Sequence, residues 1–499
     1  MRLSNVAVSI SVLMFLNLMA CGDSSGIDAS ALQELLNQQE EALISLDSGT
    51  LEGPFVIQHA VTLLGADDGS TILTAAEGAV LLVSGNPAKI RLENITIASE
   101  HIGLLAEYEG DLELENVTFQ SAHGVGAYIH NVNNLTVNET TFKGGVTADQ
   151  LTDKLETFSA LDFAVIGIYV DDVTNAQLTS VNISGYAGMP AIFHRTNLNW
   201  TDGLVTENAG LSVVVETSTA TLENVTVQNS IQSTVDGSIE PVGLTVADDA
   251  TLSSTNLTVL NLGGHGILQD HAQSSHNGLT VTNAKYAGVW VQDSATQAAP
   301  ALSISGQSTI SGNQGSSVVF LASTGITLSD TSLLASVPLE TPLQMDNLMP
   351  VSDGLHLQAA SGDIELRDLT VEGHERVGIL LCGGMEQVLP SDIAMTGVSV
   401  SVPSSDAAGL FTQNGITVSE SWDINDDALG EASFNMAPVN LKAGFIGQNG
   451  FVGQNGFTGQ NGFTGQNGFV GQNGFIGQNG FVGQNGFTGQ NGFTGQNGK

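Results

Sequence analysis

Short segments in which apolar and polar residues alternate follow one another through most of the chain, from about Leu51 to Ser419. One recurring phrase opens with a glycine and continues with an apolar stretch, as at 78–82 (GAVLL). A second phrase contains alternating apolar residues, as at 92–97 (LENITI) and 114–119 (LENVTF). Because alternation with a period of two is typical of strands with one buried face, the pattern predicts an all-β region.

The glycine phrase recurs at a nearly constant interval, with openings 23 residues apart at Gly103 and Gly126 and 22 apart at Gly266 and Gly288. Self-similarity at such a short period is the signature of a solenoid, in which each coil packs only against its neighbours. Short strands stacked about 4.8 Å apart describe a parallel β-helix of about thirteen coils and a length of roughly 60 Å. The sequence therefore predicts one continuous core instead of several domains.

The first coils resemble those of a known superfamily. The segments 56–58 (VIQ), 61–65 (VTLLG) and 69–73 (GSTIL) are similar to the opening coils of pectate-lyase-like proteins, which include carbohydrate-binding proteins and sugar hydrolases. The resemblance implies a right-handed parallel β-helix over residues 51–430. It is specific for the fold and says little of activity, because one fold serves many functions.

The residues before the repeats predict a cap for the rod. Asp28 is a suitable N-cap for a helix from Ala29 to about Leu46. Such a helix, within residues 21–50, would cover strand edges that are otherwise unpaired at the end of the solenoid. The apolar side chains on one face of this helix are Leu32, Leu35, Leu36, Leu43 and Ile44.

Residues 1–20 have the features of a secretory signal. Arg2 precedes an apolar run from Val6 to Met19, which is too short to span a bilayer as a stable helix. The following residues, 18–22 (LMACG), resemble a bacterial lipobox, which implies that Cys21 is the acylated first residue of the mature protein. Gly22 replaces the Asp of the retention signal known in enterobacterial lipoproteins, so we expect a surface-exposed protein anchored in the outer membrane.

Residues 431–499 form a linker and a tail of a different kind. From Gly444 to Asn497 the unit GFxGQN occurs nine times, with Ile, Val or Thr at x. We favour a hexapeptide β-solenoid, in which three hexads make one coil. Disorder and a collagen-like or polyglycine helix are the alternatives, although the tail lacks proline. Repeated Phe-bearing units also suit self-association of sister chains.

The charge of the chain restricts its partners. Asp and Glu number 51 against 11 Lys and Arg, a formal net charge of −40, and removal of Arg2 with the signal makes it −41 (10 − 51). Nucleic acid is therefore an unsuitable partner, because phosphate neutralisation needs basic residues. With only Cys382 left beside Cys21 in the mature chain, a disulfide framework is excluded. Cys382 follows an apolar strand, and we interpret it as packing.

Other features of the repeats favour structural interpretations. We interpret the Asn-X-Thr/Ser triplets as turn asparagines followed by strand residues. The segments 144–164 and 330–353 interrupt the period and are expected to be loops, the first with a helix at 148–161, of the kind that carries recognition. The triplets begin at Asn94, Asn116, Asn134, Asn138, Asn182, Asn224 and Asn256.

One set of polar residues is expected to form a column on the rod. Four positions after successive openings are occupied by Glu107, His130, Asp171 and Arg195, with Asp172 and His194 beside them. Stacking would bring acid, imidazole and guanidinium together, which suits general acid–base catalysis or anion recognition. The alternative is a solvated stripe of alternating charges.

Two further motifs have weaker matches. The segment 264–266 (GHG), preceded by Asp248 and Asp249, resembles part of the active site of pectin hydrolases, but Gly266 is already explained as a coil opening. Asp423, Asn425 and Asp427 have the alternating oxygen ligands of a calcium loop, although the glycine is displaced, and an exposed acidic turn is the alternative. No other cofactor is expected.

These observations predict a lipid-anchored bacterial surface β-helix with a binding, adhesion or structural role toward carbohydrate or envelope components. A surface-anchored polysaccharide lyase or glycoside hydrolase is the alternative. The expected contacts are the membrane, through the lipid on Cys21, and a polysaccharide or other cell-surface ligand. We favour the non-catalytic role because enzymes of the resembled fold hold sugar chains with several basic and aromatic residues. Here aromatic residues make up 5% of the chain, and nine of the nineteen Phe lie in the tail.

Overall fold

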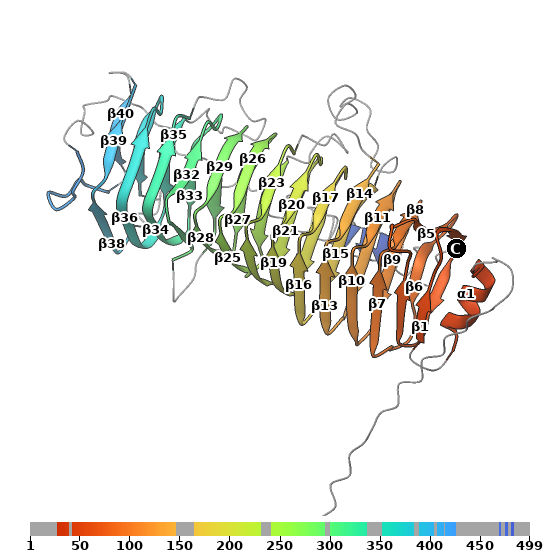
Figure 1. The fold of residues 1–499 in the computed structure, drawn as a ribbon. Helices are drawn as coiled ribbons and strands as arrows, with labels where there is room; N and C mark the ends of the chain where they lie inside the picture. The colour runs from red at the N-terminus through yellow and green to blue at the C-terminus, as the bar shows by residue number, and fades with distance from the viewer. Residues whose placement is uncertain are drawn as a thin grey trace, which may run out of the picture.

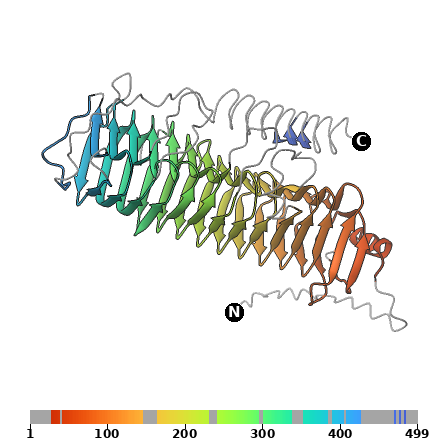
Figure 2. The same cartoon turned by 90° about the horizontal axis from the view of Figure 1, so that it is seen from above.

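The protein is a rod of stacked coils, shown in a computed structural model (Figures 1 and 2). The structure describes residues 27–38, 42–145, 164–230, 241–294, 300–336, 352–383, 389–403, 407–413, 415–425, 469–470, 475–477 and 481–483. Every strand pair between coils is parallel and joins strands of successive coils, which is the predicted right-handed parallel β-helix. Fourteen strands stack in one of its sheets, close to the thirteen coils expected from the period.

Each full coil contributes three strands, which form three stacked series. The first series, in the larger sheet, is β1 (Ala42–Ser45), β4 (Val61–Leu64), β7 (Lys89–Glu93), β10 (Asp111–Glu115), β13 (Asn134–Asn138), β16 (Asn175–Thr179), β19 (Asn197–Thr201), β22 (Thr219–Glu223), β25 (Thr251–Thr255), β28 (Gln273–Asn277), β31 (Leu302–Ser305) and β38 (Asp392–Thr396). The second, in the same sheet, is β2 (Gly49–Glu52), β5 (Thr71–Ala75), β8 (Thr96–Ser99), β11 (Thr118–Ser121), β14 (Thr141–Gly144), β17 (Asn182–Ser184), β20 (Leu204–Thr206), β23 (Thr226–Gln228), β26 (Thr258–Leu262), β29 (Thr280–Ala284), β32 (Ser308–Ser311) and β39 (Ser399–Ser401). Two long strands, β34 (Thr324–Leu334) and β36 (Ser361–Glu372), serve both series.

The third series forms a separate sheet, named here the site sheet. Its strands are β3 (Phe55–Ile57), β6 (Ala79–Val83), β9 (Ile102–Glu107), β12 (Gly124–His130), β15 (Ala164–Asp171), β18 (Ala191–His194), β21 (Leu211–Glu216), β24 (Val242–Ala247), β27 (His265–Asp270), β30 (Val289–Gln292), β33 (Val318–Leu321), β35 (Asp353–Gln358), β37 (Val377–Cys382) and β40 (Ala408–Gln413). Unlike the first two series, several of its strands are buried at every position, β21 and β27 among them.

Apolar side chains fill the interior of the rod as one continuous core. The core runs from Leu32 in the cap to Leu410 in the last coil, as the predicted solenoid requires. Like residues stack on like residues in successive coils, and the rings of Phe119 and Phe142 lie parallel with centroids 4.7 Å apart. The core thus consists of ladders of side chains that repeat with the coil.

Asparagine ladders explain the repeated LEN phrase. Asn94, Asn116, Asn224 and Asn256 have φ between 50° and 56°, a left-handed conformation that Asn tolerates at a sharp turn. Asn116 donates to Asn94 of the preceding coil at 2.8 Å, and Asn256 donates to Asn224 at 3.1 Å. The turn interpretation is confirmed at these four positions. By contrast, Asn134, Asn138 and Asn182 belong to strands.

The N-terminal cap is shorter than predicted. Helix α1 spans Ala29–Leu36, and the predicted N-cap Asp28 accepts a hydrogen bond from the backbone N–H of Ala31 at 2.8 Å. The extension to Leu46 is wrong, since Ala42–Ser45 is strand β1 and pairs with β4. Leu43 is 58% exposed while Ile44 is buried, because adjacent residues of a strand point to opposite sides. The first coil therefore begins before residue 51.

The cap closes the strand edge with a side chain. Gln33 of α1 donates to the carbonyl oxygen of Val56 at 3.0 Å and accepts from its N–H at 2.8 Å. Leu32 and Leu36 are buried against the first coil. The amide of Gln33 thus replaces a neighbouring strand for β3 and satisfies a backbone that would otherwise be an open edge.

In the described part of the tail, β41 (Phe469–Val470), β42 (Phe475–Gly477) and β43 (Phe481–Gly483) pair in parallel. Phe469 lies opposite Phe475, and Phe475 opposite Phe481, so adjacent hexads pair directly. This differs from the expected coil of three hexads. The signal segment with Cys21, residues 146–163 of the first predicted loop and 337–351 of the second lie outside the described residues. The bounds predicted for the second loop are wrong, because residues 330–334 belong to β34 and Asp353 begins β35.

Candidate functional site

The predicted polar column exists at the end of the site-sheet strands, with one correction. Glu107 lies opposite His130, His130 opposite Asp171, and Asp171 opposite His194. Arg195 is therefore not in the column, and its assignment there is wrong by one residue. The cause is the opening at Ala191, which pairs with Ile168 and not with Gly167.

Arg195 nevertheless joins the site from the adjacent turn. It has φ 48°, a left-handed conformation that turns the chain immediately after β18. Its side chain donates hydrogen bonds to Asp171, with Nε 3.0 Å from Oδ1 and Nη2 2.7 Å from both carboxylate oxygens. Arg195 therefore lies in the turn after β18, outside the column, and its side chain reaches Asp171 from there.

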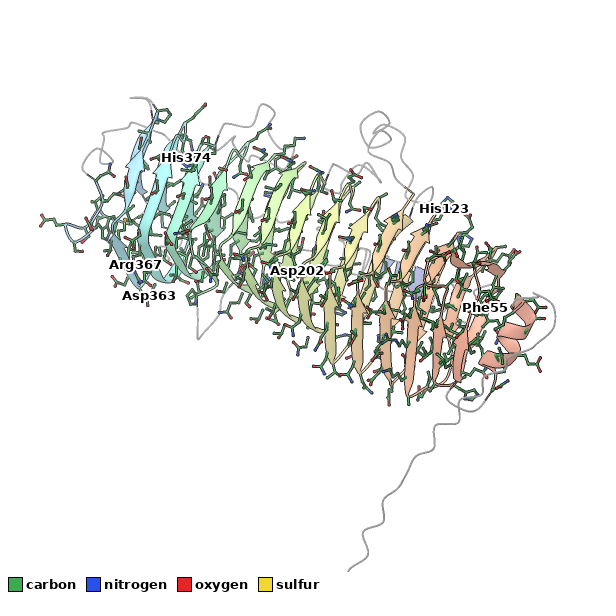
Figure 3. All side chains as sticks on the ribbon, viewed as in Figure 1. Phe55, His123, Asp202, Asp363, Arg367 and His374 are labelled. Atoms are coloured by element: carbon green, nitrogen blue, oxygen red, sulfur yellow. The ribbon has the colours of Figure 1, made fainter. Side chains whose placement is uncertain are left out.

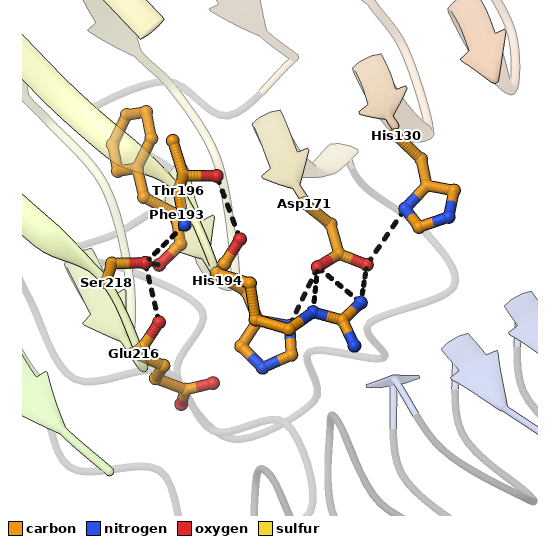
Figure 4. A network of polar contacts seen from close by, with 8 residues as sticks. His130, Asp171, Phe193, His194, Thr196, Glu216 and Ser218 are labelled. Atoms are coloured by element: carbon orange, nitrogen blue, oxygen red, sulfur yellow. Dashed lines mark hydrogen bonds and ion pairs between the residues drawn. The ribbon is translucent and has the colours of Figure 1, made fainter. Parts of the chain in front are cut away.

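Asp171 is the centre of a closed ion-pair network. His130 Nδ1 lies 3.1 Å from Oδ2, and His194 Nδ1 lies 2.9 Å from Oδ1 (Figure 4). The Asp171 side chain is only 7% exposed, and burial alone would raise its pKa. The hydrogen bonds and charges of His130, His194 and Arg195 outweigh burial and hold the pKa of Asp171 well below its usual range. The same ion pair raises the pKa of His130.

Glu216 continues the column and was missed by the sequence analysis. It lies opposite His194 at the end of β21 and is buried. Burial, reinforced by Asp248 and Asp171, raises the pKa of Glu216 well above its ordinary value. The only signal in the sequence was Glu216 itself, at the end of an apolar segment. The column residue of the other coils lies four positions after the opening glycine, and four positions after Gly210 is Val214. In the structure Glu216, two residues further on, lies opposite His194.

Stacked tyrosines lie beside this network on the same sheet. Tyr128 and Tyr169 are buried neighbours in register, with parallel rings whose centroids are 5.1 Å apart. Burial raises the pKa of both phenols well above the ordinary value, so both stay neutral. They support the strand ends on which His130 and Asp171 are placed.

The column continues over four more coils beyond His194, and the whole row from Glu107 to Gln292 is named here the polar strip. After Glu216 its positions are Ala247, Asp270 and Gln292. Gln292 donates a hydrogen bond to Asp270 Oδ2 at 2.8 Å. His271 Nδ1 contacts Asp270 Oδ1. Burial raises the pKa of Asp270 to about 6, against the opposing effects of Gln292 and His271. From Glu107 to Gln292 the strip crosses eight strands, a distance of about 34 Å at the usual strand spacing.

The GHG segment is explained by packing. An added Cβ at Gly266 would lie 2.3 Å from the carbonyl oxygen of Gly288 in the next coil, so the glycine is a coil opening. His265 is buried, and burial lowers its pKa to about 3, which keeps the imidazole neutral. Asp248 and Asp249 lie in a turn with φ 52° and 63°. The close approach of neighbouring coils and the burial of His265 thus account for this segment.

The proposed calcium ligands have other partners in the structure. Asp423 Oδ2 accepts from the N–H of Gly397 at 2.9 Å, and Asn425 bonds both the N–H and the carbonyl of Val400. Asp427 lies outside the described residues. In the described part of the chain, no three His, Cys, Asp or Glu side chains are grouped to hold a metal ion.

Cys382 ends strand β37 as a buried residue, and its thiol donates to the carbonyl of Gly383 at 3.3 Å. This placement agrees with its interpretation as packing. Among the helices of the described residues, none has the length and apolar character needed to cross a membrane.

Comparison with known proteins matches the tail to one family model. Residues 442–499 match the collagen triple helix repeat, which reflects the glycine at every third position. The match covers the tail alone. No curated protein sequence matches the chain significantly.

Solved structures with a similar architecture share little sequence with the chain. The A-module of a mannuronan C-5 epimerase from Azotobacter vinelandii is 10% identical, with a TM-score of 0.41 over 80% of this chain and 95% of that one. Tailspike protein 3 of bacteriophage CBA120 is 8% identical, with a TM-score of 0.36 over 74% and 55%. A polygalacturonase from Erwinia carotovora is 12% identical, with a TM-score of 0.24 over 81% and 95%. The fold assignment rests on the strand pairing itself.

Proposed function

We propose that the chain is a lipid-anchored β-helix of the bacterial outer surface that binds a linear carbohydrate along the polar strip without cleaving it. The observation that carries the proposal is the strip itself, which is held in register on rigid strands from Glu107 to Gln292. The acids Asp171, Glu216 and Asp270 of the strip are buried, and basic side chains beside them reach solvent, namely His130, His194, Arg195 and His271. Such groups, spaced along rigid strands, suit an extended polymer better than a small ligand.

The Asp171 network favours binding over catalysis. Both carboxylate oxygens of Asp171 are occupied, Oδ1 by His194 and Arg195 and Oδ2 by His130 and Arg195. A general base needs a free oxygen within reach of a substrate proton. The exposed groups of the network are the imidazoles and the guanidinium, which is 47% exposed and is suited to donating hydrogen bonds to hydroxyl groups.

The charge distribution favours a neutral ligand. Of the seven Lys and Arg residues that the structure describes, five form ion pairs with acidic residues of the protein. Arg367, which Figure 3 labels near the C-terminal end of the rod, pairs with Glu365 in this way. Since the chain also carries a net charge of −40, uronic acid polymers would be repelled. A neutral glycan meets no such barrier.

Binding to a panel of polysaccharides tests this function. We expect the mature protein to bind a neutral glycan, with and without calcium, and to release no shorter product. Arg195→Ala should weaken that binding about tenfold by removing an exposed donor. Arg367→Ala is the matched control, because its side chain is 52% exposed, is also paired with an acid, and lies on the other sheet. Equal effects of the two substitutions would contradict a site on the strip.

Cleavage is the second candidate function, and one observation favours it. The surroundings lower the pKa of Asp171 and raise the pKa of Glu216, two strands away. Divergent pKa values of two carboxyl groups are what acid–base cleavage of a glycosidic bond requires. In the same assay, product release by the wild type that Glu216→Gln and Asp171→Asn both abolish would replace the binding proposal with an enzyme.

The lipid anchor has its own test. The lipobox-like segment at 18–22 predicts that Cys21 is acylated after cleavage of the signal. We expect labelled palmitate to enter the wild-type chain in a bacterial host and to be absent from Cys21→Ser, which should leave the membrane fraction. Cys382→Ser is the control and should be labelled like the wild type. Label retained in Cys21→Ser would exclude this anchor.

A further inference from the structure

Trp290 has a position unlike that of the other two tryptophans of the chain. Trp200 is fully buried in the core, and Trp422 packs on the end of the core with its indole N–H bonded to the carbonyl of Ile393. Trp290 lies on β30, opposite Leu268 and Val319 on the outer face of the site sheet, and is partly exposed. A partly exposed indole on a rigid strand is a ready surface for stacking.

A chain of hydrogen bonds connects the indole to the polar strip. Trp290 Nε1 donates to Gln292 Oε1 at 2.9 Å, and Gln292 Nε2 donates to Asp270 Oδ2 at 2.8 Å. Asp270 is 1% exposed, and its other oxygen contacts Nδ1 of His271. Because Nδ1 is engaged, Nε2 of the 58% exposed His271 ring is directed away from Asp270. The indole and this nitrogen are thus fixed by one network.

The indole packs against one of a pair of buried aromatic rings. The ring of His265 is edge-on to Trp290, with centroids 5.3 Å apart, and lies 5.3 Å from the ring of Tyr286. His265 and Tyr286 are both almost fully buried. A platform whose orientation is set by packing loses little conformational entropy when a ligand binds.

We infer that Trp290 and His271 form a subsite for one neutral pyranose ring, with the sugar stacked on the indole and a hydroxyl group bonded to Nε2 of His271. This inference rests on the proposed function, since it places a defined sugar unit about 24 Å along the strip from Asp171, five strand spacings away. A stacked ring and a fixed hydrogen-bonding group together determine both position and orientation of a sugar.

The same geometry disfavours a cationic ligand. A quaternary ammonium group would need the face of the indole and a free carboxylate close to it. Both oxygens of Asp270 are engaged by Gln292 and His271. The exposed imidazole of His271 offers a hydrogen bond to a hydroxyl group and nothing to a cation without N–H or O–H donors.

Calorimetric titration of the mature protein tests the subsite. The probes are cellohexaose, laminarihexaose, maltohexaose and mannohexaose, with tetramethylammonium as the cationic probe. For the tightest neutral oligomer we expect Trp290→Ala to weaken binding at least about tenfold, and Trp290→Phe by no more than about threefold because an aromatic face remains. Trp422→Phe is the control for removing an indole elsewhere and should bind like the wild type.

The outcomes separate this inference from the proposed function. If Arg195→Ala weakens binding and Trp290→Ala does not, the strip binds carbohydrate but the subsite is wrong. If tetramethylammonium binds and Trp290→Ala abolishes its binding, the site takes a cation and the inference is overturned. If no neutral oligomer binds the folded wild type, both proposals fail. Weaker oligosaccharide binding by Trp290→Ala, together with nearly unchanged binding by Trp290→Phe, supports the subsite.

Discussion

Gly266→Ala is expected to destabilise the rod by about 2 to 4 kcal/mol, although it adds a single methyl group. The new Cβ would lie 2.3 Å from the carbonyl oxygen of Gly288 and 2.5 Å from Cγ1 of Val281. The first of these atoms belongs to the backbone of the next coil, so relief requires the coils to separate. Urea unfolding gives the change in free energy, and hydrogen exchange should show the loss of protection in β27 and β30.

Gly145→Ala is the matched control for this prediction. At Gly145 an added Cβ would meet its nearest neighbour, the carbonyl oxygen of Ala122, at an ordinary 3.5 Å. Its unfolding free energy should therefore stay within about 0.5 kcal/mol of the wild type. If Gly266→Ala were equally neutral, close approach of the coils would not be the reason for glycine at the opening.

Asp171→Asn and Glu216→Gln are expected to change stability in opposite directions near neutral pH. Asp171→Asn removes the charge that holds His130, His194 and Arg195, and should destabilise the protein by about 1 to 3 kcal/mol, a range reduced because the partners are partly exposed. Glu216→Gln should stabilise it by about 1 to 3 kcal/mol, because Gln is neutral without the cost of protonating or burying a carboxylate.

The pH dependence follows from the direction of each pKa shift. The pKa of Asp171 is lower in the folded state, so its contribution is present above its unfolded pKa near 4 and is lost as pH falls through the folded value. The pKa of His130 is higher in the folded state, so its contribution is present below its unfolded pKa near 6.5 and is lost as pH rises through the folded value. The penalty of Asp171→Asn should therefore be greatest between about pH 4 and 6.5.

Glu216 has the opposite dependence to Asp171. Its pKa is raised in the folded state, so the wild type is favoured below the unfolded pKa near 4.3 and loses stability as pH rises through the folded value. The advantage of Glu216→Gln should thus grow from about pH 4 upward. Urea unfolding from pH 3 to 8 measures both curves. Asp172→Asn, at an exposed neighbouring position, is the control, and a pH-independent difference in either variant would contradict the directions of the two pKa shifts.

The sequence by itself determined the β-helix and its period. Because each coil packs against the next in the same way, equivalent positions recur about every 23 residues and need similar residue types, which produces a visible sequence repeat. The glycines at Gly126 and Gly266 mark close approach of neighbouring coils, and Asn94 and Asn116 mark a left-handed turn. Each of these requirements restricts the residue type at a single position, so it can be recognised in the sequence without knowledge of the three-dimensional contacts.

Only the tertiary structure decided the site. Lateral register depends on the length of every turn, and a shift of one residue at Ala191 placed His194, not Arg195, opposite Asp171. Glu216 could not be assigned to the column because its strand is offset by two residues from the opening at Gly210. The hydrogen bonds from Trp290 to Gln292 and from Gln292 to Asp270 join residues of two coils. The pKa values of Asp171 and Glu216 depend on burial and on charges from neighbouring strands, so no single segment of the sequence contains the information that sets them.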